Sequence, residues 1–232
     1  MGIMKKIIIL HGWARSLDKW QNFLDALKKK GIEVDLLKIP GLTAKLEKIW
    51  ELTDYINWLK NILDKEKGKV ILVGHSNGGR IALAFTNLYP EKVEDLILIN
   101  SAAIYHNELP LQIKRFAFKA IAKIGKKLTS SKSIKNLLYK FARESDYKDL
   151  DKNAKQTMIN LISADLKSIL PQIKAPTLII WGAQDKITPL SDGLLINELI
   201  KNSKLEIIQG ARHSPQFTHV KEVVNIIAEE IL

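Results

Sequence analysis

The chain has 232 residues, no cysteine and a formal net charge of +11 at pH 7. This length is enough for one sizeable hydrophobic core, or for one core that carries an inserted subdomain. The lack of cysteine excludes a disulfide framework, a thiolate zinc site and a cysteine nucleophile. We expect no membrane-spanning segment, because no run reaches about 18 apolar residues. We expect a cytoplasmic protein, because the first ten residues are typical of a strand and not of a signal peptide.

Most of the positive charge lies in one middle segment. Residues 104–170 contain 14 Lys and Arg against 6 Asp and Glu, a net charge of +8, whereas the rest of the chain has a net charge of +3. We interpret this segment as lysine-rich, solvent-facing surface, and a specific anionic partner is the alternative. The segment contains no nucleic-acid recognition motif, so we expect no nucleic-acid partner.

The first 99 residues alternate short apolar runs with amphipathic helical patterns. Apolar runs at 3–10, 32–39, 69–73 and 93–99 are typical of strands buried on both faces of a parallel sheet. Helical patterns separate these runs at 17–30, from 53 to just before Gly68, and from the turn at Ser76 to about Pro90. Thr53 and Asp54 are the predicted N-terminal caps of the second of these helices.

The alternation is interrupted after residue 101. Residues 102–171 show amphipathic helical patterns at 113–124, at 134–141 and near 158–162, with no strand-like run. Strand and helix signals resume at 176–181, 189–201, 205–208 and 217–232. We therefore predict an α/β fold of about six mainly parallel strands with helices on both faces, formed by residues 1–101 and 172–232. Residues 102–171 are the predicted insertion, a helical lid.

A Gly-x-Ser-x-Gly sequence follows the third predicted strand, and a helical pattern follows it directly. Gly74 and Gly78 flank Ser76, where the strand and helix backbones approach too closely for Cβ atoms. In this strand–turn–helix context the serine adopts a positive φ, and its Oγ is exposed beside a helix N-terminus that favours an oxyanion. Ser76 is therefore the predicted nucleophile, although the motif alone would indicate only a glycine-rich turn.

A serine nucleophile needs a base, and the base needs an acid that orients it. His213 follows the last predicted strand and Asp185 follows the fifth, so both are expected at the same sheet edge as Ser76. The order Ser, Asp, His is one of the known orders of this triad. Asp185 could instead cap the next helix. The other position for such an acid, residues 100–103 after the fourth strand, holds no acidic side chain.

The other four histidines are predicted to have different roles. His11 is expected to hold the first turn, and His106 lies in the insertion. His75 is next to the serine, but adjacent side chains in a turn point in different directions. His219 falls on the first turn of the final predicted helix, where a surface or packing role is expected.

Two backbone amides are predicted to stabilise an oxyanion beside Ser76. Asn77 supplies one, as the residue after the nucleophile, and Trp13 is positioned after the first strand to supply the other. No pair of histidines or acids has metal-ligand spacing on a helix, so no metal site is predicted. No Gly-x-Gly-x-x-Gly sequence follows a strand, so no nucleotide cofactor is predicted.

These motifs, in this order, resemble the α/β-hydrolase superfamily over nearly the whole chain. Residues 11–13, 74–79 and 182–185 and His213 are similar to its oxyanion loop, nucleophile elbow, acid loop and histidine loop. The similarity is greatest to small carboxylesterase-like members with a helical lid. The resemblance implies a strand order of 4-3-5-6-7-8 in the family's count, with the chain beginning at the family's third strand.

We therefore expect a serine hydrolase that cleaves a carboxylic ester through an acyl-enzyme, with a small to medium apolar acyl group. The same triad also hydrolyses thioesters, amides and carbon–carbon bonds, and the fold does not separate these reactions. A ligand-binding receptor or scaffold without turnover is the alternative of a different class. The expected partner is a small-molecule ester, without stable insertion into a membrane.

Overall fold

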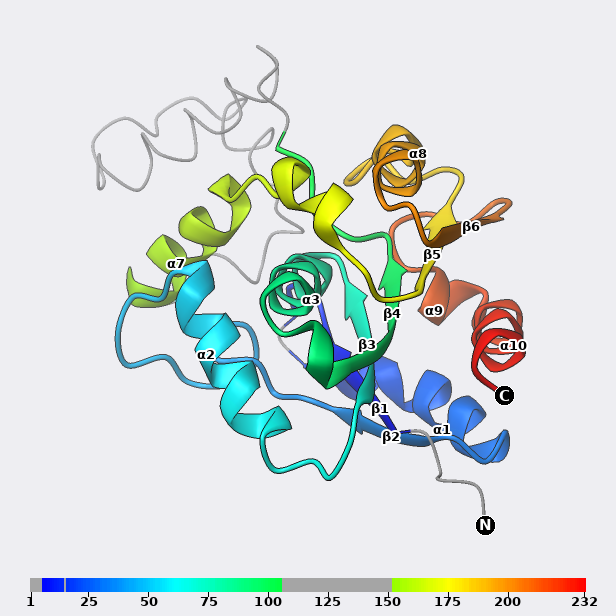
Figure 1. Cartoon of the computed structure of the whole chain (residues 1–232), viewed down its shortest axis with the longest axis horizontal. Helices are drawn as coiled ribbons and strands as arrows, with labels where there is room; N and C mark the ends of the chain where they lie inside the picture. Colours follow the sequence, from blue (N-terminus) through cyan, green and yellow to red (C-terminus); the bar gives the residue numbers. More distant parts are fainter. Residues whose placement is uncertain (1–5, 15, 106–151) are drawn as a thin grey trace, which may run out of the picture.

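The computed structural model describes residues 6–14, 16–105 and 152–232 (Figure 1). Within them, six strands form one sheet in the order β2-β1-β3-β4-β5-β6, and every neighbouring pair is parallel. The strands are β1 (Lys6–Leu10), β2 (Glu33–Leu36), β3 (Val70–His75), β4 (Val93–Ile99), β5 (Thr177–Gly182) and β6 (Ser203–Ile208). The predicted fold class and the strand order implied by the family resemblance are both confirmed.

Helices cover both faces of the sheet. On one face lie α2 (Leu52–Leu63), α3 (Asn77–Leu88) and α8 (Leu190–Leu199), and on the other lie α1 (Gln21–Lys29) and α10 (Val220–Ile231) (Figure 1). Successive residues of a strand point to opposite faces, so Ile8 packs with the first set of helices and Ile7 and Ile9 pack with the second. Because both faces are buried, the strands have continuous apolar sequences.

The second predicted helix begins one residue earlier than expected. Its N-cap is Glu51, which has an extended backbone (φ −99°, ψ 173°), and α2 starts at Leu52. The Oδ2 atom of Asp54 accepts a hydrogen bond of 2.8 Å from the Glu51 N–H group. The predicted cap position is therefore wrong, because Thr53 and Asp54 both lie inside the helix, but Asp54 does take part in capping as the third helical residue of a capping box.

The last predicted helix is divided into two. A short helix, α9 (Pro215–Thr218), precedes α10, and His219 between them has a non-helical backbone (φ −129°, ψ 44°). The prediction that His219 lies on the first turn of one continuous helix is therefore wrong. Three short 3₁₀ helices complete the described elements: η1 (Asp18–Trp20), η2 (Pro90–Lys92) and η3 (Lys167–Gln172).

The described end of the predicted insertion is α7 (Lys152–Ser163), which is followed by η3. Apolar residues of this region are buried in the same core as α3: Leu161, Leu166 and Leu170. Side chains of α7 also hold residue Trp50, because Thr157 accepts a hydrogen bond from its N–H group and Asn160 donates one to its carbonyl. The helices predicted at 113–124 and 134–141 lie outside the described residues. No helix in the described part of the chain is long and apolar enough to cross a membrane.

The packing of α3 on β1 predicts that Gly78→Ala is strongly destabilising. A Cβ atom at Gly78 would lie 2.0 Å from the carbonyl oxygen of Leu10, and backbone cannot move aside as a flexible side chain can. We expect a loss of more than about 3 kcal/mol in the free energy of unfolding, measured by urea denaturation. Gly68→Ala is the matched control, because its Cβ would meet nothing within 4 Å. Equal stability of the two variants would contradict the close approach.

Candidate active site

Ser76 lies in the sharp turn between β3 and α3. Its backbone has φ 54° and ψ −119°, a region that a residue with a side chain adopts only when the surrounding structure holds it there. The Ser76 N–H group donates to the carbonyl of Ile99, and its own carbonyl accepts from the N–H groups of Gly79 and Ala102. Hydrogen bonds from three places in the chain thus hold the strained residue.

Glycine positions around Ser76 allow the backbones to touch. A Cβ atom at Gly74 would lie 2.4 Å from the Cα atom of Gly79, and one at Gly12 would lie 2.8 Å from the Cβ atom of Ser76. The loop after β1 therefore packs directly on the serine. Trp13 follows Gly12 in this loop and is half-buried against the core, so the predicted oxyanion loop lies beside the predicted nucleophile.

His213 lies between the Ser76 hydroxyl and the Asp185 carboxylate. Its Nε2 atom is 3.0 Å from Ser76 Oγ, and its Nδ1 atom is 2.8 Å from Asp185 Oδ2. Asp185 follows β5 and His213 follows β6, and the carboxyl ends of parallel strands meet at one edge of the sheet. The structure thus brings together three side chains that are far apart in the sequence.

The Asp185 carboxylate is buried and receives several hydrogen bonds besides that of His213. The Ile187 and Thr188 N–H groups donate to Oδ1, at 2.8 and 3.3 Å, and the Thr188 hydroxyl donates to Oδ2 at 2.6 Å. Burial alone would raise the pKa of Asp185, but the hydrogen bonds from His213, Thr188 and Ile187 hold it below its ordinary value. Asp185 is therefore a stable anion at neutral pH, which is what an orienting acid requires.

Asn100 is a further partner of Asp185 that the sequence reasoning missed. It directly follows β4, has a positive φ of 44°, and is fully buried. Its Nδ2 atom donates to Asp185 Oδ2, and its Oδ1 atom accepts from the Gly182 N–H group at 3.1 Å. Asparagine tolerates a left-handed backbone better than most residues. The sequence did contain a signal for Asn100. It is a polar residue directly after a buried strand, and such a residue lies at the sheet edge that carries the site.

Asn77 is the first residue of α3, directly after Ser76. The N-terminal amides of a helix favour negative charge, so an oxyanion that formed beside Ser76, the N-cap of α3, would be stabilised by this end of the helix. The side chain of Asn77 accepts a hydrogen bond of 3.2 Å from Arg80 Nη1, which also donates to the carbonyl of Leu161 in α7. Arg80, another residue that the sequence reasoning missed, is buried and links the nucleophile turn to the end of the insertion.

His11 holds the loop after β1. Its Nε2 atom accepts from the Ile39 N–H group at 3.4 Å and lies 2.9 Å from the Thr43 hydroxyl. The Nδ1–H group donates to the carbonyl of Gly12 at 2.5 Å. Burial lowers the pKa of His11, more than its bond to the Gly12 carbonyl raises it, so the ring is neutral. This is the loop-holding position predicted for His11.

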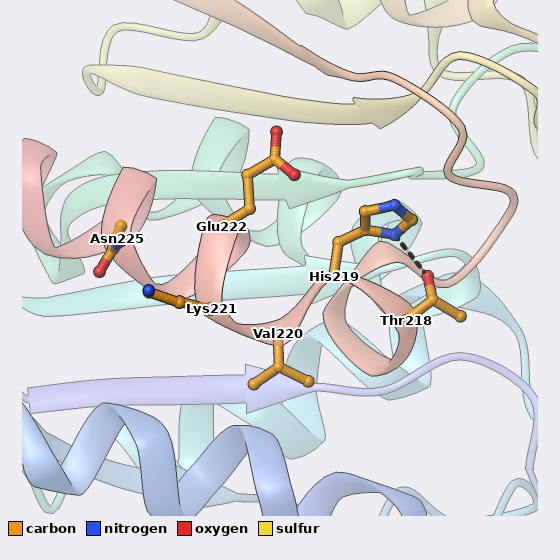
Figure 2. A pocket seen from close by; sticks show the side chains of 6 residues that line it. All are labelled: Thr218, His219, Val220, Lys221, Glu222 and Asn225. Carbon is orange, nitrogen blue, oxygen red and sulfur yellow. Dashed lines mark hydrogen bonds between the residues drawn. The ribbon is translucent and has the colours of Figure 1, made fainter.

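His219 lies outside this cluster, in a surface hollow of about 480 Å³ at the start of α10. Figure 2 shows its ring beside the Thr218 hydroxyl, which is 2.9 Å from His219 Nδ1. Residues of α9 and α10 and the link between them line the hollow: Thr218, His219, Val220, Lys221, Glu222 and Asn225. His106 lies outside the described residues. In the part of the chain that the structure describes, no three His, Asp or Glu side chains gather as metal ligands.

Ser76, His213 and Asp185 form a hydrogen-bonded chain that can activate a hydroxyl. A neutral imidazole can accept the Ser76 proton at Nε2 while its Nδ1–H group donates to the anionic Asp185. The positive charge that forms on His213 is then balanced by the adjacent carboxylate. Such an arrangement can transfer an acyl group to the serine oxygen.

Comparisons with known proteins identify the family of this chain. Residues 5–220 match the family model described as the alpha/beta hydrolase fold. The chain is 28% identical to a 2-hydroxy-6-oxononadienedioate/2-hydroxy-6-oxononatrienedioate hydrolase of Escherichia coli O81 (strain ED1a). The alignment is 251 residues long and covers 92% of this chain and 82% of that protein. It is 27% identical over 236 residues to the pimeloyl-[acyl-carrier protein] methyl ester esterase of Wigglesworthia glossinidia brevipalpis. That alignment covers 92% of this chain and 88% of the esterase.

The crystal structure of an α/β hydrolase enzyme from the metagenome of sediments of the lagoon of Mar Chica, Morocco, is also similar. Its TM-score is 0.71 at 26% sequence identity, over 99% of this chain and 91% of that one. The family match covers most of the sequence, and the six-stranded sheet has the strand order that the resemblance implied. The chain therefore belongs to the alpha/beta hydrolase fold family, and it is a hydrolase.

Proposed function

We propose that this protein is a serine hydrolase that cleaves a carboxylic ester through an acyl-serine intermediate. Ser76 Oγ attacks the acyl carbon as His213 Nε2 takes its proton, and a tetrahedral oxyanion forms. The oxyanion collapses, the bond to the alcohol breaks, and His213 gives its proton to the leaving oxygen. Water, activated by His213, then attacks the acyl-serine and releases the acid and free Ser76.

The observation that carries this proposal is the unbroken hydrogen-bond chain from Ser76 through His213 to Asp185. Its two links are 3.0 and 2.8 Å long, within the range that proton transfer requires. A receptor or scaffold that only binds a ligand has no need for a strained serine, a base and a buried anionic acid in line. These features favour turnover over a purely ligand-binding role.

The oxyanion donors in this proposal are the backbone amides of Asn77 and Trp13. Asn77 begins α3, and the tight packing of Gly12 on Ser76 supports a position for the Trp13 amide on the opposite side. Two fixed amides in a site shielded from water stabilise the developing charge without reorganising, which is worth several kcal/mol in the transition state. Gly74 and Gly78 would then serve catalysis indirectly, because they keep the turn close to these donors.

The substrate class rests on the relatives and on the expected lid. One relative is named as a methyl ester esterase, which supports an ester substrate for this chain. Another is named as a hydrolase of 2-hydroxy-6-oxononadienedioate, which is not named as an ester. Hydrolysis of a carbon–carbon bond by the same triad is therefore kept as the second candidate. Both reactions pass through the same attack of Ser76 on a carbonyl carbon. They differ in whether oxygen or carbon leaves.

The first prediction concerns the nucleophile. Ser76→Ala removes only the attacking oxygen, so we expect the protein to stay folded and ester hydrolysis to fall by about 10⁴–10⁶-fold. Labelling by a fluorophosphonate should disappear in the same variant, as measured by intact-protein mass spectrometry. Ser168→Ala, at an exposed position in η3, is the control and should keep both ester hydrolysis and fluorophosphonate labelling. Ester hydrolysis at the parental rate in Ser76→Ala would refute the assignment.

The second prediction concerns the substrate. We expect kcat/KM on neutral nitrophenyl esters to rise from acetyl to medium-length acyl groups, because the amphipathic patterns of residues 102–171 predict an apolar cover over the site. Activity on a neutral ester should change less than about threefold between about 20 and 200 mM salt, because added salt screens charges in this range and an uncharged substrate does not depend on them. A fall of more than about tenfold would make the basic segment 104–170 part of the site.

The third prediction uses the position of Asn100. Asp185→Asn should lower kcat by about 10³–10⁴-fold, because an amide holds His213 in the wrong tautomer. Asn100 Nδ2 and His213 Nδ1 both donate to Asp185 Oδ2, so an acid at position 100 would lie within reach of the imidazole. We therefore expect the double variant Asn100→Asp/Asp185→Asn to recover at least about tenfold of the lost kcat. A double variant no better than Asp185→Asn would contradict this placement.

A further inference from the structure

His75 connects the nucleophile turn to the loop that carries His213. It is the last residue of β3, directly before Ser76, and it is 6% exposed. Its Nε2 atom lies 2.9 Å from the backbone carbonyl oxygen of His213. A carbonyl oxygen can only accept, so Nε2 carries the proton and donates it. The side chain of one histidine thus holds the backbone of the other.

The ring of His75 is neutral. Burial, with a smaller effect of the nearby His213, lowers its pKa to about 3, against the opposing effects of its bond to the His213 carbonyl and of Asp185. The titratable groups that face it are His213, Asp185 and His11. The ring centres of His75 and His213 are 5.1 Å apart. A neutral ring at this distance adds no positive charge that would oppose protonation of His213.

Packing fixes the orientation of the His75 ring. Trp20 and Phe217 contact it, with ring centres at 6.0 and 6.4 Å. On the side of the oxyanion loop, a Cβ atom at Gly12 would lie 3.1 Å from His75 Nδ1. The imidazole is therefore enclosed by η1, α9 and the loop after β1. It cannot turn away from the His213 carbonyl without disturbing all three.

Other hydrogen bonds hold the loop that carries His213 on both sides of that residue. After it, the Ser214 carbonyl accepts from the Phe217 N–H group and from the Thr218 hydroxyl. The Ala211 N–H group donates to the carbonyl of Ile208, and the Ala211 carbonyl accepts from the Gln184 N–H group. These backbone bonds lie two residues before His213. The bond from His75 acts at His213 itself, and it comes from the residue next to the nucleophile. It therefore joins the two reacting residues by a short, rigid path.

We propose that His75 is a positioning residue that sets the distance between Ser76 and His213 by holding the His213 carbonyl. The proposal rests on the proposed serine hydrolase function. Proton transfer requires Ser76 Oγ and His213 Nε2 within hydrogen-bond distance, and a shift of about 1 Å can cost about 100-fold in rate. Both acylation and deacylation use this contact, so the loss would appear in kcat and not in substrate binding.

The test compares His75→Phe, which keeps a flat ring but removes the donor, with His75→Gln, whose amide N–H group can reach the same carbonyl. We expect His75→Phe to lower kcat about 10- to 100-fold with KM changed less than about twofold, and His75→Gln to recover most of the loss. His219→Phe, at the half-exposed histidine in the hollow of Figure 2, is the matched control and should leave kcat unchanged.

Two outcomes would overturn the proposal. A kcat for His75→Phe equal to that of the parent would show that the hydrogen bond does not position His213. Equal losses in His75→Phe and His75→Gln would show that a restored donor does not restore kcat, so the hydrogen bond to the His213 carbonyl would not be what positions His213. Ser76→Ala, assayed in parallel, separates these results from a failure of the proposed function, because full activity in that variant would refute the nucleophile itself.

A measurement on the unaltered protein keeps the proposal testable if a variant does not fold. In NMR spectra of protein labelled with ¹⁵N-histidine, we expect one imidazole to remain the neutral Nε2–H form from about pH 5 to pH 9. The same signal should disappear in His75→Gln. A spectrum in which the His75 ring titrates within this range would contradict a buried donor to the His213 carbonyl.

Discussion

Around Ser76 the backbone is packed so closely that neighbouring positions have no room for a side chain. A Cβ atom at Gly78 would meet the carbonyl oxygen of Leu10 at 2.0 Å, and one at Gly12 would meet Ser76 itself. Strands β1 and β3, helix α3 and the loop after β1 are therefore fixed relative to one another by backbone contact. The position of Ser76 Oγ follows from this packing, as does the strained φ of 54°. Every other residue of the site is placed relative to that oxygen.

A buried polar layer beneath the imidazole supports this arrangement. Asp185 is shielded from water, and a buried carboxylate is costly unless donors satisfy its oxygens. His213, Thr188, Asn100 and backbone amides supply them. Asn100 also accepts from the Gly182 N–H group at the end of β5, so the strand ends and the acid belong to one network. A fully satisfied network of this kind specifies a single geometry, since moving one member leaves several buried groups without partners.

Much of this molecule could be predicted from its sequence, because the decisive signals are local. Continuous apolar runs indicated strands covered on both faces, and the strand–turn–helix pattern around Ser76 indicated the nucleophile turn. Parallel topology then placed the residues after β5 and β6, Asp185 and His213, at the same sheet edge. The position of Asn100 after a buried strand indicated the correct sheet edge. The contacts of Asn100 and Arg80 could not be assigned, because each joins segments about 80 residues apart. The helix break at His219 was missed because neither His219 nor its neighbours Thr218 and Val220 are strong helix breakers.

His75 shows how a correct local inference can miss a role in the fold. Its direction away from the Ser76 hydroxyl excluded it as the base, and the structure places its ring against the His213 backbone instead. A backbone carbonyl has no sequence signature, so a contact across 138 positions could not be predicted from residue types. The choice of histidine has a physical reason. The proposed role requires a flat, packed donor without charge. A lysine or arginine there would place a cation beside the imidazole that, in the proposed mechanism, itself becomes positive. A buried imidazole, kept neutral by desolvation, meets both requirements.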